Sequence, residues 1–450
     1  MSSEWPLVRL GAVVEIKHGW PFKSEFFSVD ANSSELPIVV AIGNFEYSGG
    51  FRFGTTLTKR YSDEYPAEYA LRPGETLLVM TCQTAGGEIL GIPARIPNDG
   101  RLYLHNQRLG RVVPKTESVF NDFLYWLFLH PDFNRHLVNS ASGTKILHTA
   151  PIRIGSFQFR LPPLPEQRGI ASVLDALDDR IALLRETNAT LEAIAQALFK
   201  SWFVDFDPVR AKMQGRAPEG MDEATAALFP DGFEESELGL VPRGWRNVSL
   251  KEAVAIHDSK RIPLSGQERD KRKGPYPYYG AAALMDAVDD YLFDGVYLLT
   301  GEDGSVADTN GYPIMQYVWG KFWVNNHAHI LQGKDGVATE HVMLAMQRTN
   351  ITPYITGAVQ AKLSQTNMWR INFLKPSREV AEHFGSMLEP LFVRFRNNAE
   401  QAQTLATLRD TLLPRLISGA LRLPAAESMA GTDATRSDNS EKPAAYRQAV

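Results

Sequence analysis

Two long seams of apolar residues constrain this chain more than any other feature of its sequence. Apolar side chains recur at steps of four and three along residues 164–203 and again along residues 377–421. This spacing is typical of helices that pair in a coiled coil, because a helix on the surface of a globule carries a broader apolar stripe. The residues predicted to form the pairing seam are Leu174, Leu177, Ile181, Leu184, Asn188, Leu191, Leu391, Phe395, Asn398, Leu405 and Leu412.

One asparagine interrupts each seam, Asn188 in the first helix and Asn398 in the second. A buried asparagine lowers the stability of a coiled coil but fixes its register, and two of them cost least when they hydrogen-bond each other. We therefore expect an antiparallel pair in which these residues meet; the alternative is that each helix packs only on its own globule. The predicted register places Ile170 near Leu416, Leu174 near Leu412 and Trp202 near Phe384, with Leu408 also in the seam.

The rest of the chain is duplicated around these helices. Each half opens on a tryptophan-led segment, at Trp5 and at Trp245, and continues through a long stretch rich in Gly, Pro, Tyr and Phe. Such a repeat predicts an α+β fold, with two mixed α/β globules joined by the two long antiparallel helices. The predicted segments are globules at 1–163 and 245–376, helices at 164–203 and 377–421, an acidic proline-rich linker at 204–244 and a disordered tail at 422–450.

Cysteine content and hydropathy indicate the cellular compartment of the protein. Cys82 is the only cysteine, which excludes a disulfide framework and a multi-cysteine zinc site and suits a reducing cytoplasm. The first residues lack the basic and apolar regions of a secretory signal. No apolar run approaches the roughly 18 to 20 residues that a membrane span needs. We therefore expect a cytoplasmic protein with no membrane partner.

The net charge of −5 is concentrated in the middle of the chain. Residues 161–244 carry 15 acidic and 8 basic side chains, whereas residues 1–160 carry 15 and 16. An acidic molecule attracts DNA poorly, even if one face of a balanced globule is basic. Any DNA binding by this chain is therefore expected to need a cationic partner.

The region around the first helix carries the most distinctive residues. LPPLPEQ at 161–167 opens the helix, ALFKSWFVDFDPV at 197–209 closes it, and GMD at 220–222, LFP at 228–230 and VPRGW at 241–245 follow. This run closely resembles the central region of type I restriction-modification specificity subunits, and the resemblance extends in order from Trp5 to about Leu421. It implies that each globule is a target recognition domain for one half of a bipartite double-stranded DNA site.

The resemblance also implies partners and cofactors. The paired helices would act as a spacer that holds two methyltransferase subunits, and up to two restriction motor-nuclease subunits would join them. S-adenosylmethionine would be bound by the methyltransferase subunits, and ATP and Mg by the restriction subunits. This chain would then be non-catalytic and hold no cofactor. Its sequence indeed contains no phosphate-binding loop of the GxxxxGK[ST] kind, no Asn-Pro-Pro-aromatic methyltransferase motif and no evident nuclease constellation of carboxylates with lysine.

Candidate DNA-binding residues lie on glycine-rich turns and in one basic stretch. Glycine lets the backbone approach phosphate, and Asn, Gln and Arg side chains can read base edges. The stretch at 260–273 is rich in cations and is followed at once by Tyr276, Tyr278 and Tyr279, which suits phosphate contact; the alternative is a solvated loop. The candidates are Lys23, Gln83, Asn106, Gln107, Arg108, Lys145 and His148 in the first globule, and Lys260, Arg261, Lys271, Arg272, Lys273, Tyr279, Asn325, Asn326, His327, Gln360 and Lys362 in the second.

A metal site is not expected. His327 and His329 lie two residues apart, but no third ligand at a suitable spacing accompanies them. Two other functions are kept as alternatives, namely a fused restriction-modification enzyme with its own catalysis and a coiled-coil scaffold without DNA specificity. The missing motifs argue against the first, and the two related globules argue against the second.

Overall fold

The structure, a computed structural model, describes residues 5–28, 35–53, 58–84, 86–236, 239–357 and 359–423. The predicted disordered tail lies outside these residues from position 424 onward. The chain divides into two compact units. The first comprises Met1–Ile181 with Gln403–Val450, and the second comprises Ala182–Ala402. In the part of the chain that is described, no helix has the length and apolar character needed to cross a membrane.

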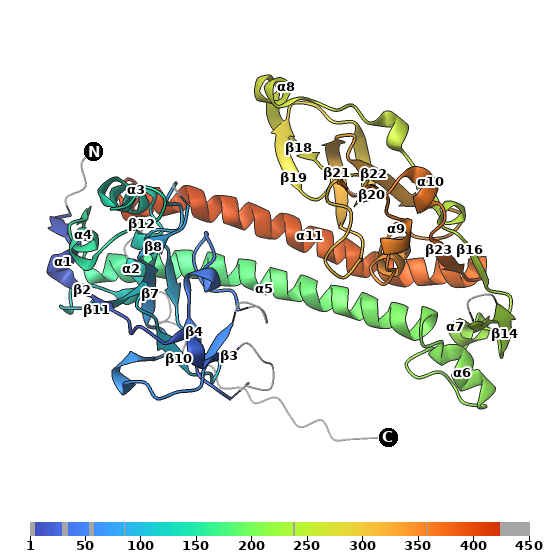
Figure 1. The fold of residues 1–450 in the computed structure, drawn as a ribbon, viewed down its shortest axis with the longest axis horizontal. Coiled ribbons are helices and arrows are strands. Elements are labelled where there is room, and N and C mark those ends of the chain that lie inside the picture. Colours follow the sequence, from blue (N-terminus) through green and yellow to red (C-terminus); the bar gives the residue numbers. More distant parts are fainter. Residues whose placement is uncertain are drawn as a thin grey trace, which may run out of the picture. The chain divides into compact units, whose positions relative to one another are not determined.

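Two small sheets and four short helices build the globule of the first unit (Figure 1). One sheet has the order β2-β11-β7-β9, and the other has the order β3-β5-β4-β10-β6 with β4 and β10 parallel. Two separate strand pairs, β1–β13 and β8–β12, are antiparallel. The bounds are β1 Leu7–Arg9, α1 Leu10–Val13, β2 Val14–His18, β3 Phe27–Ser28, β4 Ile38–Val40, β5 Lys59–Tyr61, β6 Ala70–Leu71, β7 Thr76–Val79, β8 Thr81–Cys82, β9 Pro93–Arg95, β10 Tyr103–His105, β11 Leu109–Pro114, α2 Asn121–Phe128, α3 Pro131–Ser140, β12 Leu147–His148, α4 Pro151–Gly155 and β13 Gln158–Arg160.

A six-stranded sheet dominates the second unit, in the order β17-β22-β20-β21-β18-β19. Strands β18 and β21 are parallel and the other neighbours are antiparallel. A separate pair, β16–β23, lies at the two ends of the globule's sequence. The bounds are β16 Arg246–Ser249, β17 Val254–Ile256, α8 Gly266–Lys271, β18 Lys273–Tyr279, β19 Leu284–Val288, β20 Phe293–Gly301, β21 Met315–Val324, β22 Ala328–Gly333, α9 Thr339–Met346, α10 Gln365–Met368 and β23 Asn372–Lys375.

The same strand pair closes both globules. Leu7 of β1 pairs with Arg160 of β13, and Arg246 of β16 pairs with Lys375 of β23. Each pair joins the tryptophan-led segment to the strand just before a long helix, and both tryptophans are buried. The internal repeat seen in the sequence is therefore a repeat of structure.

The long helices are α5, Leu164–Phe203, and α11, Arg378–Ile417. In the second unit, Asn398 Nδ2 donates a hydrogen bond of 2.9 Å to Asn188 Oδ1, and the rings of Trp202 and Phe384 lie 5.3 Å apart. These contacts confirm the predicted antiparallel register there. In the first unit, the buried residues Ile170, Leu174 and Leu416 belong to one core, with Leu412 packed against it. All eleven predicted seam residues are buried or half-buried.

One seam residue was predicted wrongly. Leu408 is 44% exposed, and the neighbouring Arg409 is turned inward instead. The guanidinium of Arg409 donates to Asp178 of α5 at 2.5 Å. An arginine can occupy a half-buried seam because its aliphatic stem packs while its charged end finds a carboxylate, which an apolar periodicity does not reveal.

The segment at 204–244 contains short elements and is more than a tether. Its elements are α6 Asp207–Met213, α7 Glu223–Ala227, β14 Phe233–Ser236 and β15 Gly239–Pro242. Val209 and Phe229 are buried in the core of the second unit, where Phe229 packs edge-on against Trp202 at 4.8 Å between ring centroids. The four prolines and the acidic composition of this segment predicted a linker, so its packing against the core was not visible in the sequence.

Candidate nucleic-acid interface

Three segments of the first unit form a small framework that we call the first cradle, residues 80–84, 106–108 and 142–149. Met80 N donates to Arg108 O at 3.1 Å, and Thr149 N donates to Met80 O at 2.9 Å. Thr81 and Cys82 pair with His148 and Leu147. The three segments are therefore held together by backbone hydrogen bonds, which leaves their side chains available for other contacts.

The second unit builds the same framework from residues 302–306, 325–327 and the described residues 356–357 and 359–363, which we call the second cradle. Glu302 N donates to His327 O at 2.8 Å, and Leu363 N donates to Glu302 O at 2.8 Å. The backbones of Asp303 and Lys362 form an antiparallel β-bridge, just as Thr81 and His148 are paired between β8 and β12. Each backbone contact of the first cradle thus has a counterpart in the second.

Two local turns repeat as well. The Asn106 side chain accepts a hydrogen bond from Arg108 N at 3.1 Å, and the Asn325 side chain accepts one from His327 N at 2.9 Å. In the third segment of each cradle a glycine has positive φ, +102° at Gly143 and +93° at Gly357. A Cβ on either glycine would lie about 2 Å from the carbonyl oxygen three residues later, so only glycine fits. The equivalent positions are Thr81 with Asp303, Gln107 with Asn326, Arg108 with His327 and His148 with Lys362.

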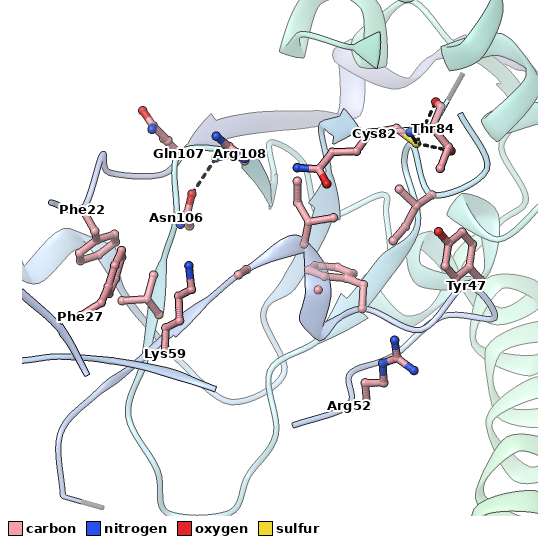
Figure 2. A pocket seen from close by; sticks show the side chains of 17 residues that line it. Phe22, Phe27, Tyr47, Arg52, Lys59, Cys82, Thr84, Asn106, Gln107 and Arg108 are labelled. Carbon is pink, nitrogen blue, oxygen red and sulfur yellow. Dashed lines mark hydrogen bonds between the residues drawn. The ribbon is translucent and has the colours of Figure 1, made fainter. Parts of the chain in front are cut away.

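Two concavities lie at the first cradle. One has a volume of about 500 Å³ and includes Arg52, Lys59, Asn106 and four aromatic residues in its lining (Figure 2). The other, of about 350 Å³, includes His18, Thr81, His148 and Thr149. Both are lined by Gln83, Gln107 and Arg108, and no carboxylate belongs to the described lining of either. A hollow with cations, amides and no carboxylate suits a polyanion that also presents hydrogen-bonding edges.

Most candidates of the first globule meet at these concavities. Gln83, Asn106, Gln107, Arg108 and His148 all line one or both of them. Lys145 is exposed on the third segment but lines neither, and Lys23 lies elsewhere, with its ammonium 5.8 Å from the Phe26 ring centroid. Sequence reasoning did not select Arg52, Lys59 or Thr149, because they lie far along the chain from the polar turn at 106–108 or outside its motifs.

His105 supports the turn of the first cradle from below. Its ring is 1% exposed, and Nε2 donates to Leu109 O at 2.9 Å across the turn. Burial lowers the pKa of His105 to about 4, so the ring is neutral at physiological pH. The residue is therefore a structural support for Asn106, Gln107 and Arg108.

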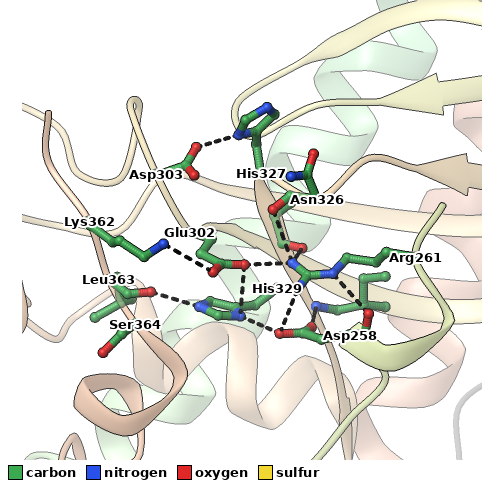
Figure 3. Close-up of polar contacts among 12 residues, drawn as sticks. Asp258, Arg261, Glu302, Asp303, Asn326, His327, His329, Lys362, Leu363 and Ser364 are labelled. Atoms are coloured by element: carbon green, nitrogen blue, oxygen red, sulfur yellow. Dashed lines mark hydrogen bonds and ion pairs between the residues drawn. The ribbon is translucent and has the colours of Figure 1, made fainter. Parts of the chain in front are cut away.

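The second cradle surrounds a network of ion pairs (Figure 3). Arg261 donates to Glu302 at 2.6 Å and to the Ala328 carbonyl at 2.8 Å, and it lies 3.5 Å from Asp258. Lys362 lies 3.6 Å from Glu302. The Arg261 side chain is only 15% exposed, so this candidate is occupied inside the protein rather than displayed at the surface.

A group with metal-binding potential was missed in the sequence. Asp258, Glu302 and His329 bring their ligand atoms within 4.8 Å of one another, although strand pairing joins them from three distant segments. His329 contacts Asp258 at 2.6 Å through Nδ1 and donates to Leu363 O at 2.8 Å through Nε2. The guanidinium of Arg261 contacts both carboxylates, and Lys362 lies beside Glu302, so this cluster already has cationic partners within the chain.

The basic stretch of the second globule is largely engaged as well. Arg272 pairs with Asp289 at 2.8 Å and lies over the Trp323 ring, and Lys273 pairs with Asp286 at 2.8 Å. Lys260 and Lys271 are exposed and form no ion pair with any described residue.

The remaining candidates divide between the interior and the rim of the second cradle. Tyr279 packs edge-on against Phe322, and burial raises the pKa of its hydroxyl. Asn325 is 5% exposed, so it shapes the turn. Asn326, His327 and Gln360 are exposed at the rim, where His327 Nδ1 lies 2.5 Å from an Asp303 carboxylate oxygen.

The match to a known protein family is duplicated in the same way. Residues 2–193 and 242–405 match the family described as type I restriction modification DNA specificity domain. The chain is 26% identical over 390 residues to the type I restriction enzyme HindI specificity subunit of Haemophilus influenzae, covering 72% of this chain and 82% of that one. It is 23% identical over 338 residues to the MjaIX specificity subunit of Methanocaldococcus jannaschii, covering 71% and 73%.

A solved structure shares the fold. The type I restriction-modification S subunit from M. genitalium aligns with a TM-score of 0.56 at 15% identity, covering 92% of this chain and 96% of that one. This likeness concerns the architecture of helices and globules.

Proposed function

This chain belongs to the type I restriction-modification DNA specificity family, and we propose that, as a specificity subunit, it reads a split DNA target with one half assigned to each globule. The duplicated cradle carries the proposal, because the same backbone hydrogen bonds recur in both units around different side chains. A repeated framework with variable side chains is what two readers of two unlike half-sites require.

Each globule would dock in the major groove of its half-site. Phosphate contacts fix the position of a protein on DNA, and contacts to base edges select the sequence. In the first globule, Arg52 and Lys59 lie in the larger concavity and would contact phosphate. Arg52 also pairs with Glu46 at 3.6 Å, so Lys59 is the cleaner candidate.

The chemistry would be done by other subunits. Two methyltransferase subunits that bind S-adenosylmethionine, and up to two restriction subunits that bind ATP and Mg, would assemble with this chain in the cytoplasm. The DNA of the cell is there, and the single buried thiol of Cys82 suits a reducing compartment.

Helix α5 offers an apolar face for a methyltransferase subunit. Leu183 and Ile194 are 51% and 43% exposed and lie eleven residues apart, which places them on one side of the helix. Thr187 and Thr190 lie between them, and their hydroxyls donate to the backbone carbonyls of Leu183 and Glu186. Because the hydroxyls are turned to the backbone, this face is less polar than its composition suggests.

The division of labour is tested with labelled S-adenosylmethionine. Purified chain alone should transfer no methyl group to DNA, and it should do so at specific sites once the methyltransferase subunits are added. Given the net charge of −5, the chain alone should also bind DNA weakly and without sequence preference. Methyl transfer by the chain alone would instead support a fused enzyme.

A further inference from the structure

The two cradles can be compared position by position, because their backbones make the same contacts. Met80 and Thr81 of the first cradle correspond to Glu302 and Asp303 of the second, through their bonds to Arg108, Thr149, His327 and Leu363. Side chains at equivalent positions therefore project from equivalent backbone. The two cradles therefore differ in their side chains while sharing these backbone contacts.

The first cradle presents hydrogen-bond donors. Arg108 is exposed, and its side chain makes no hydrogen bond or ion pair with any described residue. Its backbone is fixed at both ends, since its N–H donates to Asn106 and its carbonyl accepts from Met80. A free guanidinium on a fixed backbone is suited to a bidentate contact with the N7 and O6 acceptors of guanine.

An unpartnered polar atom at the smaller concavity also points to a missing ligand. Thr149 is 8% exposed, and its Oγ1 is buried with no hydrogen-bond partner. It lines the hollow together with Gln83, Gln107 and Arg108. A buried hydroxyl without a partner is costly, so an unsatisfied polar group belongs to a residue that lines this hollow.

The second cradle presents an acceptor beside the corresponding place, because His327, the equivalent of Arg108, contacts Asp303, the equivalent of Thr81. His327 occupies Oδ1 of Asp303, and Oδ2 has no hydrogen-bond partner among the described residues. Glu302 is different, because Arg261 and Lys362 already engage it. Asp303 is thus the carboxylate left for a ligand, and an ionised carboxylate can only accept.

We propose that the two cradles read bases with opposite hydrogen-bonding character, such that Arg108 donates to a guanine and the Asp303 carboxylate accepts from the amino group of an adenine or cytosine. The inference rests on the proposed function and names the specificity-determining residues within it. The two half-sites must then differ in sequence, since the surfaces that read them differ in polarity.

The test compares methylated motifs of the intact complex after single substitutions. Arg108→Ala should relax one G·C position in one half-site, lowering discrimination there by roughly 10- to 100-fold. Asp303→Asn should alter one position in the other half-site, because it keeps an acceptor for His327 but places a donor where Oδ2 was. Lys59→Ala is the matched control. It should weaken binding to all DNA sequences alike and reduce the salt dependence of that binding.

Three results would overturn this inference. Arg108→Ala could behave like Lys59→Ala, both substitutions could affect the same half-site, or neither could change the motif. The first and the last of these leave one half-site assigned to each globule, so the proposed function would stand. An effect of both substitutions on the same half-site would contradict that assignment as well. A wild-type motif that is continuous rather than split would instead contradict the proposed function.

Discussion

Asn398 donates from Nδ2 to Oδ1 of Asn188 at 2.9 Å, and Asn188 in turn donates to the Phe395 carbonyl at 2.9 Å. Asn398 is 2% exposed, so its amide has exchanged water for these partners. The two residues recognise each other between otherwise apolar neighbours. A shift of either helix by one turn would leave a buried amide unsatisfied, which is why this pair fixes the register.

Replacing one asparagine should therefore cost more than replacing both. Asn398→Leu leaves the Asn188 carbonyl without its donor and should destabilise the second unit by about 1–3 kcal/mol. The double variant Asn188→Leu with Asn398→Leu should recover most of that loss while loosening the register. Urea unfolding of the full chain in a double-mutant cycle measures the coupling, with Thr187→Ala on the exposed face as control. Additive effects would contradict the pairing.

Substitution of Arg261 should lower the stability of the second unit rather than remove a direct DNA contact. Arg261→Met removes the cation from two carboxylates that are 13% and 17% exposed. Breaking one side of a mostly buried ion pair typically costs about 3 kcal/mol, so the second unit should unfold at clearly lower urea concentration. Arg378→Met, which breaks the exposed pair with Glu382, should have no measurable effect. An Arg261→Met variant of normal stability but weak DNA binding would show a direct DNA contact.

Lys271 is better suited than Arg272 and Lys273 to test whether the basic stretch contacts phosphate. Its charge is unpaired among the described residues, whereas Arg272 and Lys273 are bound to Asp289 and Asp286. Lys271→Ala should weaken the complex on all sequences and lower the slope of log affinity against log salt by about 1. Binding measured between low and moderate salt tests this, with Arg378→Ala as a control of equal charge. Relaxation at one base position with an intact slope would reassign Lys271 to base reading.

His105 should make the first unit sensitive to acid. In the unfolded chain its ring takes up a proton below about pH 6.5, but burial lowers the pKa in the folded state to about 4. The stability that depends on the neutral ring is therefore complete above pH 6.5 and is lost as the pH falls toward 4, by roughly 3 kcal/mol. Hydrogen exchange in β10 and β11 at pH 7 and pH 4 measures the loss. His105→Gln should flatten this pH dependence, and an unchanged dependence would be the contrary result.

The helices could be predicted from sequence because their information is local and periodic. Asn188 and Asn398 interrupt otherwise apolar seams, so the register followed from two residues. Leu408 was misplaced because the seam there changes from apolar packing to the Arg409–Asp178 ion pair. Periodicity of apolar residues carries no record of a charged partner on another helix.

The sites could be predicted only in part. Asn106, Gln107 and Arg108 were visible as a polar turn, but their kinship with Asn325, Asn326 and His327 was not. The two turns correspond through backbone hydrogen bonds, which the sequence does not show. The residues common to both cradles at these turns are one asparagine and one glycine. The network of Asp258, Glu302 and His329 was missed because three distant segments of the second unit supply it.

Exchange of one globule shows whether each globule reads one half of the target. Residues 245–376 begin and end at the paired strands β16 and β23, so they can be replaced by the corresponding residues of another specificity subunit. The methylated motif of a host that expresses the complete system is then sequenced for both versions. We expect one half of the motif to change while the other half persists. A change in both halves, or in neither, would contradict it.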